Sequence, residues 1–189
     1  MAIGKINVDV MAKRTRWEHA LKIMLVQRFM LGLREYHNPT LIKVQSGLLL
    51  DTIISQLQLK WKCILDHSKD CSKMQKLKFK GFSTQDFVLN SLLESLGVRD
   101  GAIGSEQNVL YNSAIIFELW NVNGQPQVKV LYKRRHDSST LMNLSGLVRN
   151  CPGHSGSCPL ANFVRCCQEY RTTDPMAVCN PPHPPSTPS

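Results

Sequence analysis

Several short motifs that mark common enzyme and metal sites are missing from this chain. It has no Gly-rich P-loop, no His-Glu-x-x-His and no Gly-x-Ser-x-Gly sequence. These absences argue against a phosphate-binding loop, a zinc-protease helix and a serine-hydrolase elbow. None of the seven cysteines is spaced as Cys-x-x-Cys. Zinc is therefore weakly supported, and we expect neither a metal nor another cofactor.

Long apolar runs are also missing. The most apolar stretch, residues 20–33, is interrupted by Lys22, Gln27 and Arg28 and is too short to span a bilayer. Residues 1–16 carry charge but no apolar signal-peptide region, so we expect no membrane span and find no signal peptide. The cysteines instead favour export. Five of the seven lie in the last forty residues, which is typical of an exported protein. The compartment stays unknown.

The positive charge lies in one half of the chain. The net charge of the 189 residues is +9; residues 1–80 hold 15 Lys+Arg against 6 Asp+Glu, and residues 81–189 hold 8 of each. The lysines form no stripe with interleaved aromatic residues, so we expect no nucleic-acid partner. An apolar content of 42% suffices for one domain with a core.

The first half of the chain predicts two helices. Residues 17–36 form an amphipathic pattern, residues 42–60 form a second apolar pattern, and Asn38-Pro39 separates them. A polar loop with Cys63 and Cys71 is expected over 62–76. The basic residues 1–16 are weakly patterned and a candidate for disorder, and the Pro-rich tail 181–189 cannot form a helix or a central strand.

The central segment predicts a strand over 77–82, a polar turn, and a helix that ends at Gly97. The turn Ser83-Thr84-Gln85-Asp86 has two interpretations. In a capping box, Ser83 caps the helix and Asp86 reaches back to its N–H. In an anion site, the turn holds a phosphate and Asp86 is a general acid. Both can hold together.

The second half predicts a Gly-containing loop over 98–108 and a β-hairpin. Strands over 114–122 and 127–133 flank Asn123-Gly124, a strong hairpin turn, and a short helix is expected over 160–170. Cys151 and Cys158 either close a small disulfide loop or are two unpaired thiols. Asn143 begins a glycosylation sequon, which matters only if the chain is exported. The sole His-Asp pair, His136-Asp137, is expected in a surface loop.

In their order along the chain, these segments resemble the C-terminal half of the histidine acid phosphatases, of the histidine phosphatase superfamily. The resemblance covers residues 17–180. It rests on the helix after Trp17, the Gln85-Asp86 turn after its strand, the hairpin, and two sequence elements: Ser46-Gly47-Leu48-Leu49-Leu50 and Cys151…Cys158-Pro159-Leu160-Ala161-Asn162-Phe163.

The resemblance implies an α/β fold: an incomplete domain over 17–180 with a mixed sheet, flanking helices and a C-terminal β-hairpin. It implies hydrolysis of phosphate monoesters through a phosphohistidine, with a His-Asp pair that contacts the phosphate and protonates the leaving alcohol. Gln85 stands at the phosphate-binding histidine position, and Asp86 keeps the proton-donor position. The family's Arg-His-Gly-x-Arg motif, which carries the nucleophile, occurs nowhere in these residues. The resemblance also implies that Cys179 has lost its partner.

We therefore expect a histidine acid phosphatase relative, with phosphomonoesters as the family's substrate class, that is catalytically silent as written. Two alternatives remain: a non-catalytic module that binds a phospho-ligand or a protein, and a truncated gene-model product. The family is secreted or lysosomal. A homodimer stays open, and a sheet that lacks a central strand leaves unpaired edges, which predicts low solubility or dependence on a partner.

Overall fold

The computed structural model describes Lys22, Val26 and residues 28–66, 68–104, 108–151 and 156–180. The expectations for residues 1–16, for most of 17–27 and for the tail 181–189 lie outside these residues. Of the expected helix over 17–36, Lys22, Val26 and residues 28–31 are helical. Gly32 then takes a positive φ of 65°, and Arg34–Tyr36 form the 3-10 helix η1.

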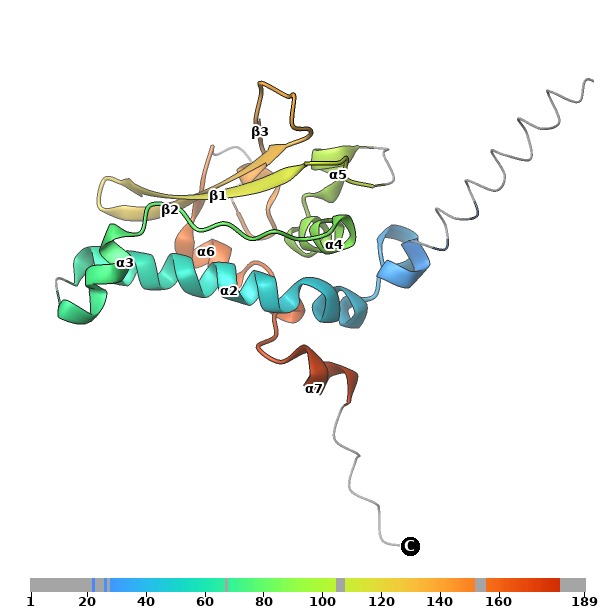
Figure 1. Cartoon of the computed structure of the whole chain (residues 1–189), viewed down its shortest axis with the longest axis horizontal. Coiled ribbons are helices and arrows are strands. Elements are labelled where there is room, and N and C mark those ends of the chain that lie inside the picture. Colours follow the sequence, from blue (N-terminus) through green and yellow to red (C-terminus); the bar gives the residue numbers. More distant parts are fainter. Residues whose placement is uncertain are drawn as a thin grey trace, which may run out of the picture.

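Helix α2, Pro39–Leu65, lies below the sheet and α4 in Figure 1. The side chain of Asn38 accepts hydrogen bonds from the N–H groups of Thr40 and Leu41, and Pro39 takes the first position, where no N–H is needed. The helix is longer at both ends than the expected 42–60. Asn38-Pro39 therefore not only separates two helices but also caps the start of the second.

A glycine lets α2 pack closely against the C-terminal part of the chain. A Cβ on Gly47 would lie 2.5 Å from the carbonyl oxygen of Tyr170, in the 3-10 helix η4, Gln168–Tyr170. One turn further on, Arg171 Nη2 donates to Asp51 Oδ1 at 2.6 Å. Gly47 and Asp51 thus hold the C-terminal segment on α2.

The segment after α2 is helical, so the expected polar loop over 62–76 is wrong. Lys69–Cys71 form the 3-10 helix η2 and Ser72–Lys76 form helix α3. Cys63 and Cys71 are joined in a disulfide. Gln75 Nε2 donates to the carbonyl oxygens of Cys63 and Asp66, at 2.9 Å each. The cross-link and these two bonds fold the segment back on the end of α2.

The expected strand over 77–82 is also wrong, since residues 77–85 are in no helix or strand. A strand needs a neighbouring backbone to pair with, and no described strand pairs with this segment. Helix α4, Asp86–Leu96, follows. Gly97 ends it with φ 75° in the left-handed region, as predicted. Helix α5, Arg99–Ile103, occupies part of the expected loop over 98–108.

The hairpin is confirmed. Strands β1, Ala114–Val122, and β2, Gln125–Lys133, pair antiparallel around Asn123-Gly124, whose φ values of 52° and 80° suit a two-residue hairpin turn. On its other side, β2 pairs antiparallel with β3, Met142–Asn143, and β4, Cys158–Pro159. A 3-10 helix, η3, Ser145–Leu147, follows β3.

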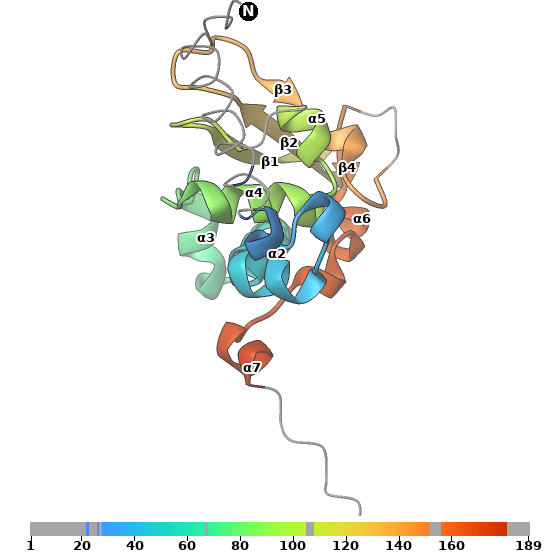
Figure 2. The same cartoon turned by 90° about the vertical axis from the view of Figure 1, so that its right-hand side faces the viewer.

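The sheet and the helices form two layers around one core. In both views α2 and α4 lie on one side of the sheet (Figures 1 and 2). Helix α6, Leu160–Arg165, follows β4, and α7, Pro175–Cys179, ends the described chain. The expected helix over 160–170 is split between α6 and η4. The core includes the fully buried Leu50, Ile54, Leu93, Leu96, Val128, Val130, Tyr132 and Phe163. The α/β class with flanking helices and a hairpin is confirmed, and the described strand pairings are all antiparallel.

Candidate functional site

The Gln85-Asp86 turn lies at the start of α4. Gln85 is the N-cap residue, with an extended backbone (φ −97°, ψ 164°), and Asp86 is the first helical residue. Both side chains are exposed. The first N–H groups of a helix have no backbone partner within the helix, and a carboxylate lies beside them here and accepts from one of them, that of Phe87.

The capping-box interpretation of this turn is wrong. Gln85, not Ser83, is the N-cap, and its side chain makes no capping hydrogen bond. A Ser-x-x-Asp box requires the serine at the N-cap, and the helix begins two residues too late for that. The carboxylate of Asp86 instead accepts a hydrogen bond from the next residue: its Oδ1 accepts from the N–H of Phe87 at 2.8 Å.

The other oxygen of Asp86 is held from across the fold. Asn108 Nδ2 donates to Asp86 Oδ2 at 2.7 Å. Asn90, one helical turn beyond Asp86 and 1% exposed, donates in turn to Asn108 Oδ1. Asn90 Oδ1 is buried and has no hydrogen-bond partner among the described atoms. An Asp86–Asn108–Asn90 chain therefore fixes the carboxylate on the end of α4.

Sequence reasoning missed Asn90 and Asn108. One signal for Asn90 is available in the pattern: an amide between Leu89 and Leu92 interrupts the apolar stripe of the helix, and a buried polar side chain needs a partner. Asn108 gives no such signal. It lies in a loop 22 residues from Asp86, and only the tertiary fold brings the two together.

A long groove passes the turn. Its volume is ≈ 1270 Å³. It is lined by residues of α2, by the segment Leu77–Asp86, by the first residues of α4, and by Val109–Trp120, which includes most of β1. Gln85 and Asp86 are both part of the lining, so the structure brings the two predicted site residues together at one surface depression.

The charges in this groove have mixed sign. Lys78 and Lys80 line it, as do Asp86 and Glu118. Lys80 Nζ lies 5.3 Å from the centroid of the Phe82 ring. Lys60 also lines the groove, but its ammonium donates to three backbone carbonyls, those of Met74, Gln75 and Leu77, at 2.8–3.0 Å. Lys60 therefore fixes the start of the segment, and Lys78 and Lys80 are the other lysines of the lining.

The His136-Asp137 pair lies outside this groove, in an exposed turn. The hydrogen bond from Arg135 to Asp137, at 2.6 Å, lowers the pKa of the Asp137 carboxyl. The pair has no helix start behind it, which agrees with a surface loop. Within the part of the chain that the structure describes, no three His, Cys, Asp or Glu side chains gather as a metal site.

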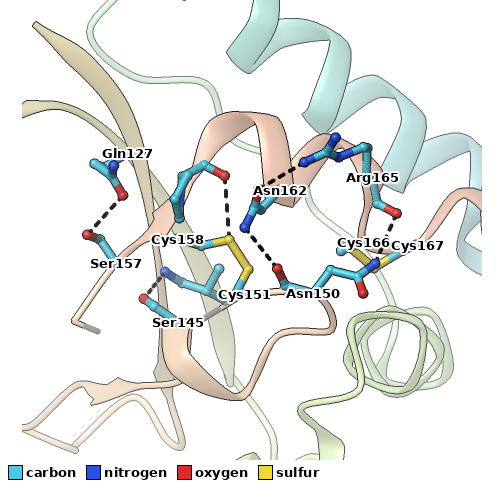
Figure 3. The surroundings of a disulfide bond; sticks show 12 residues. Gln127, Ser145, Asn150, Cys151, Ser157, Cys158, Asn162, Arg165, Cys166 and Cys167 are labelled. Carbon is cyan, nitrogen blue, oxygen red and sulfur yellow. Dashed lines mark hydrogen bonds between the residues drawn. A yellow bond between two sulfur atoms is a disulfide. The ribbon is translucent and has the colours of Figure 1, made fainter. Parts of the chain in front are cut away.

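The predicted Cys151–Cys158 disulfide is present (Figure 3). Cys158 is fully buried beside β2, and Asn162 Nδ2 donates to the carbonyl of Asn150 at 3.1 Å. Cys166 and Cys167 are also joined. Cys179 is free and exposed, as the odd cysteine count requires. The Cys151–Cys158 bond ties Cys151 to β4, which pairs with β2.

Asn143, the glycosylation candidate, is exposed on β3. Its Nδ2, the atom that a glycan would occupy, donates to the carbonyl of Gly156 at 2.8 Å. Its Oδ1 accepts from both the N–H and the hydroxyl of Ser145, at 3.0 and 2.6 Å. Glycosylation stays a prediction and would have to replace the bond to Gly156. Separately, the described helices include none that is both long and apolar enough to cross a bilayer.

Comparison with known proteins gives relatives that are named as putative acid phosphatases. No family model matches the chain. It is 37% identical over 145 residues to "Putative acid phosphatase 1" of Caenorhabditis briggsae and 33% identical over 145 residues to the protein of the same name in Caenorhabditis elegans. It is 32% identical over 143 residues to "Putative acid phosphatase 10" of C. elegans.

These matches cover most of the chain but a minor part of each relative. They include 77% of the chain for the first two relatives and 73% for the third, and 34% of each relative. The chain is therefore similar to proteins named as acid phosphatases and spans about a third of the length of these curated relatives.

Proposed function

We propose that this chain is a part of a histidine acid phosphatase fold that keeps the proton-donor position of the active site and has no phosphatase activity by itself. The observation that carries the proposal is the position of Asp86. It lies at the N-terminus of a helix, its carboxylate is held by Asn108, and it faces a groove of ≈ 1270 Å³. The similarity to proteins named as acid phosphatases over 77% of the chain supports the same assignment.

The chemistry of the turn fits a proton donor beside a phosphate. The N-terminal end of α4 favours an anion, and Lys78 and Lys80 add positive charge. Asp86 is the first residue of this helix, and its carboxyl group can give a proton to a leaving alcohol. Gln85 donates only a neutral hydrogen bond, and charge-assisted bonds are about twice as strong, so phosphate binding here is weaker than with a histidine.

We attribute the absence of phosphatase activity in this chain to a missing nucleophile. Phosphoryl transfer to a protein needs a nucleophilic side chain next to the acid. No described histidine lines the groove, and no Arg-His-Gly sequence occurs in the 189 residues. A proton donor without that partner has no covalent intermediate to form or to break.

A chimera tests the role of Asp86. The matched third of the C. briggsae relative is replaced by the corresponding residues of this chain, and hydrolysis of p-nitrophenyl phosphate is measured at acid pH. We expect Gln85→His to raise kcat/KM and Asp86→Asn to lower kcat about 10²–10⁴-fold. Asp70→Asn, an exposed carboxylate outside the groove, is the control. Equal rates for Asp86→Asn and Asp70→Asn would contradict the assignment.

A second candidate is a module that binds a phospho-ligand without turnover. It is favoured by the same helix N-terminus and by the two lysines of the groove. Thermal shift with millimolar phosphate and phosphoserine distinguishes it, with Lys78→Glu/Lys80→Glu as the test variant and Lys73→Glu/Lys76→Glu on α3 as the matched control. No shift for the unmodified chain at millimolar ligand contradicts the binding module.

A further inference from the structure

The positive charge of the chain is concentrated in one short stretch. Residues 62–80 hold six lysines, two aspartates and neither arginine nor glutamate, which gives this stretch a net charge of +4. Since the net charge of all 189 residues is +9, almost half of the excess lies in about a tenth of the chain. A cluster of about four to eight basic residues is typical of segments that bind an anionic surface.

This stretch is folded into a compact helical turn. The Cys63–Cys71 disulfide joins the end of α2 to η2, and Gln75 of α3 donates to the carbonyls of Cys63 and Asp66. Figure 1 shows α3 beside the C-terminal end of α2, which it contacts. Five exposed residues of this turn, which we call the basic end, are Lys62, Ile64, Leu65, Lys73 and Lys76.

The charge of the basic end is not neutralised within the fold. Among the described residues, none of its three lysines forms an ion pair with a carboxylate. Both oxygens of Asp66 accept hydrogen bonds from Ser68, which leaves Asp70 as the other carboxylate of the stretch. The ammonium groups are therefore available to an external anion.

Apolar side chains accompany these charges. Ile64 and Leu65, the last two residues of α2, are 37% and 67% exposed. No residue of the basic end lines the groove beside Asp86, so the basic end is a separate surface. Binding to a membrane interface grows with the apolar area that enters it and with the attraction between basic side chains and anionic lipids. The basic end supplies both.

We propose that the basic end binds the surface of an anionic lipid bilayer, with Ile64 and Leu65 in the interfacial layer and the lysines at the lipid headgroups. Lysine is a compact charge on a flexible stem and needs no fixed partner geometry, which suits a fluid surface. The proposal concerns attachment to one leaflet and does not depend on the role of Asp86.

A nucleic acid fits this surface less well. Sites for single strands combine basic side chains with aromatic rings on which bases stack, and arginine is preferred for bidentate contacts with phosphate. The basic end has no arginine and no aromatic residue, and its apolar side chains are aliphatic. Its lysines would still attract nucleic acid without sequence preference, so DNA is included in the test.

Vesicle flotation of the 189-residue chain tests the charge. Vesicles of phosphatidylcholine alone are compared with vesicles of equal parts phosphatidylcholine and phosphatidylserine, and we expect binding to the second kind, weakened by salt. Each lysine near an anionic surface contributes a factor of about five in affinity. Lys73→Gln/Lys76→Gln should therefore weaken binding about tenfold or more. Arg134→Gln/Arg165→Gln, at two exposed positions elsewhere, is the matched control and should change little.

A second pair of variants tests the apolar contact. Leu65→Gln should weaken vesicle binding about tenfold, because it removes apolar area from the interface. Met176→Gln on α7, where the side chain is 68% exposed, is the control, and circular dichroism verifies that all variants fold. Four outcomes overturn the proposal: no binding to the anionic vesicles, equal losses for the lysine and arginine pairs, equal losses for Leu65→Gln and Met176→Gln, or tighter binding to DNA than to the vesicles at the same salt.

Discussion

Asn108 Nδ2 donates a 2.7 Å hydrogen bond to Asp86 Oδ2, and this bond ties the loop before β1 to the first residue of α4. The same amide group accepts from the N–H of Val109 at 3.1 Å and from Asn90. Asn108 therefore connects an exposed carboxylate with a buried amide. The position of the candidate acid depends on the packing of the core behind it.

Replacement of Asn108 should cost more stability than replacement of Asp86. In Asn108→Ala the buried Asn90 amide loses its partner, and an unpaired buried polar group costs about 1–3 kcal/mol. Asp86→Ala removes an exposed carboxylate, for which we expect about 0.5 kcal/mol. Urea unfolding of the two variants measures the difference. A loss of stability for Asp86→Ala equal to that for Asn108→Ala would contradict the connection.

The Cys63–Cys71 disulfide should stabilise the helical turn after α2. It closes a short loop between two buried sulfurs. For Cys63→Ser/Cys71→Ser we expect a decrease of about 2–3 kcal/mol in the free energy of unfolding. Cys179→Ser, at the free exposed cysteine, is the control and should change it by less than about 0.5 kcal/mol. Denaturant unfolding under non-reducing conditions makes the comparison, and equal effects would count against a structural cross-link.

Gly47→Ala should destabilise the chain although alanine favours helices. At an exposed helix position the change gains up to about 1 kcal/mol. Here the new Cβ would lie 2.5 Å from the Tyr170 carbonyl oxygen, and the forced displacement costs about 1–3 kcal/mol. Thermal unfolding of Gly47→Ala is compared with Ser55→Ala on the exposed face of α2. A higher Tm for Gly47→Ala would show that η4 does not pack there.

Tyr132 should make stability fall at alkaline pH. Burial raises the pKa of its hydroxyl above the ordinary value, against a smaller opposite effect of the hydrogen bond to Ser113. When the pH rises above about 10, the unfolded chain releases this proton while the folded chain keeps it, so the free energy of unfolding decreases. Tyr132→Phe should reduce this slope, and Tyr111→Phe, at an exposed site, should leave it unchanged. Equilibrium urea unfolding between about pH 9 and 11 measures the free energy of unfolding of both variants, and identical slopes against pH would refute the assignment to Tyr132.

Local signals in the sequence predict part of this fold well. Asn123-Gly124 predicts the hairpin and Gly97 the end of α4, because each depends on the backbone freedom of a few adjacent residues. The strand expected over 77–82 fails because a strand also needs a partner, which sequence pattern does not supply. The prediction of a loop over 62–76 is wrong because a disulfide and the hydrogen bonds of the Gln75 side chain fold that segment. Local propensity includes neither of these. The Gln85-Asp86 turn was predictable from its pattern, whereas Asn108 was not, since the fold alone brings it to Asp86.

The most direct test of the proposed function is turnover of p-nitrophenyl phosphate by the purified 189-residue chain at acid pH. The comparison is with the same preparation after heat denaturation and with Asp86→Asn. The proposal predicts that all three hydrolyse the substrate at the same background rate, and that Gln85→His does not raise it. Turnover by the folded chain well above the denatured control, lost in Asp86→Asn, would contradict catalytic silence.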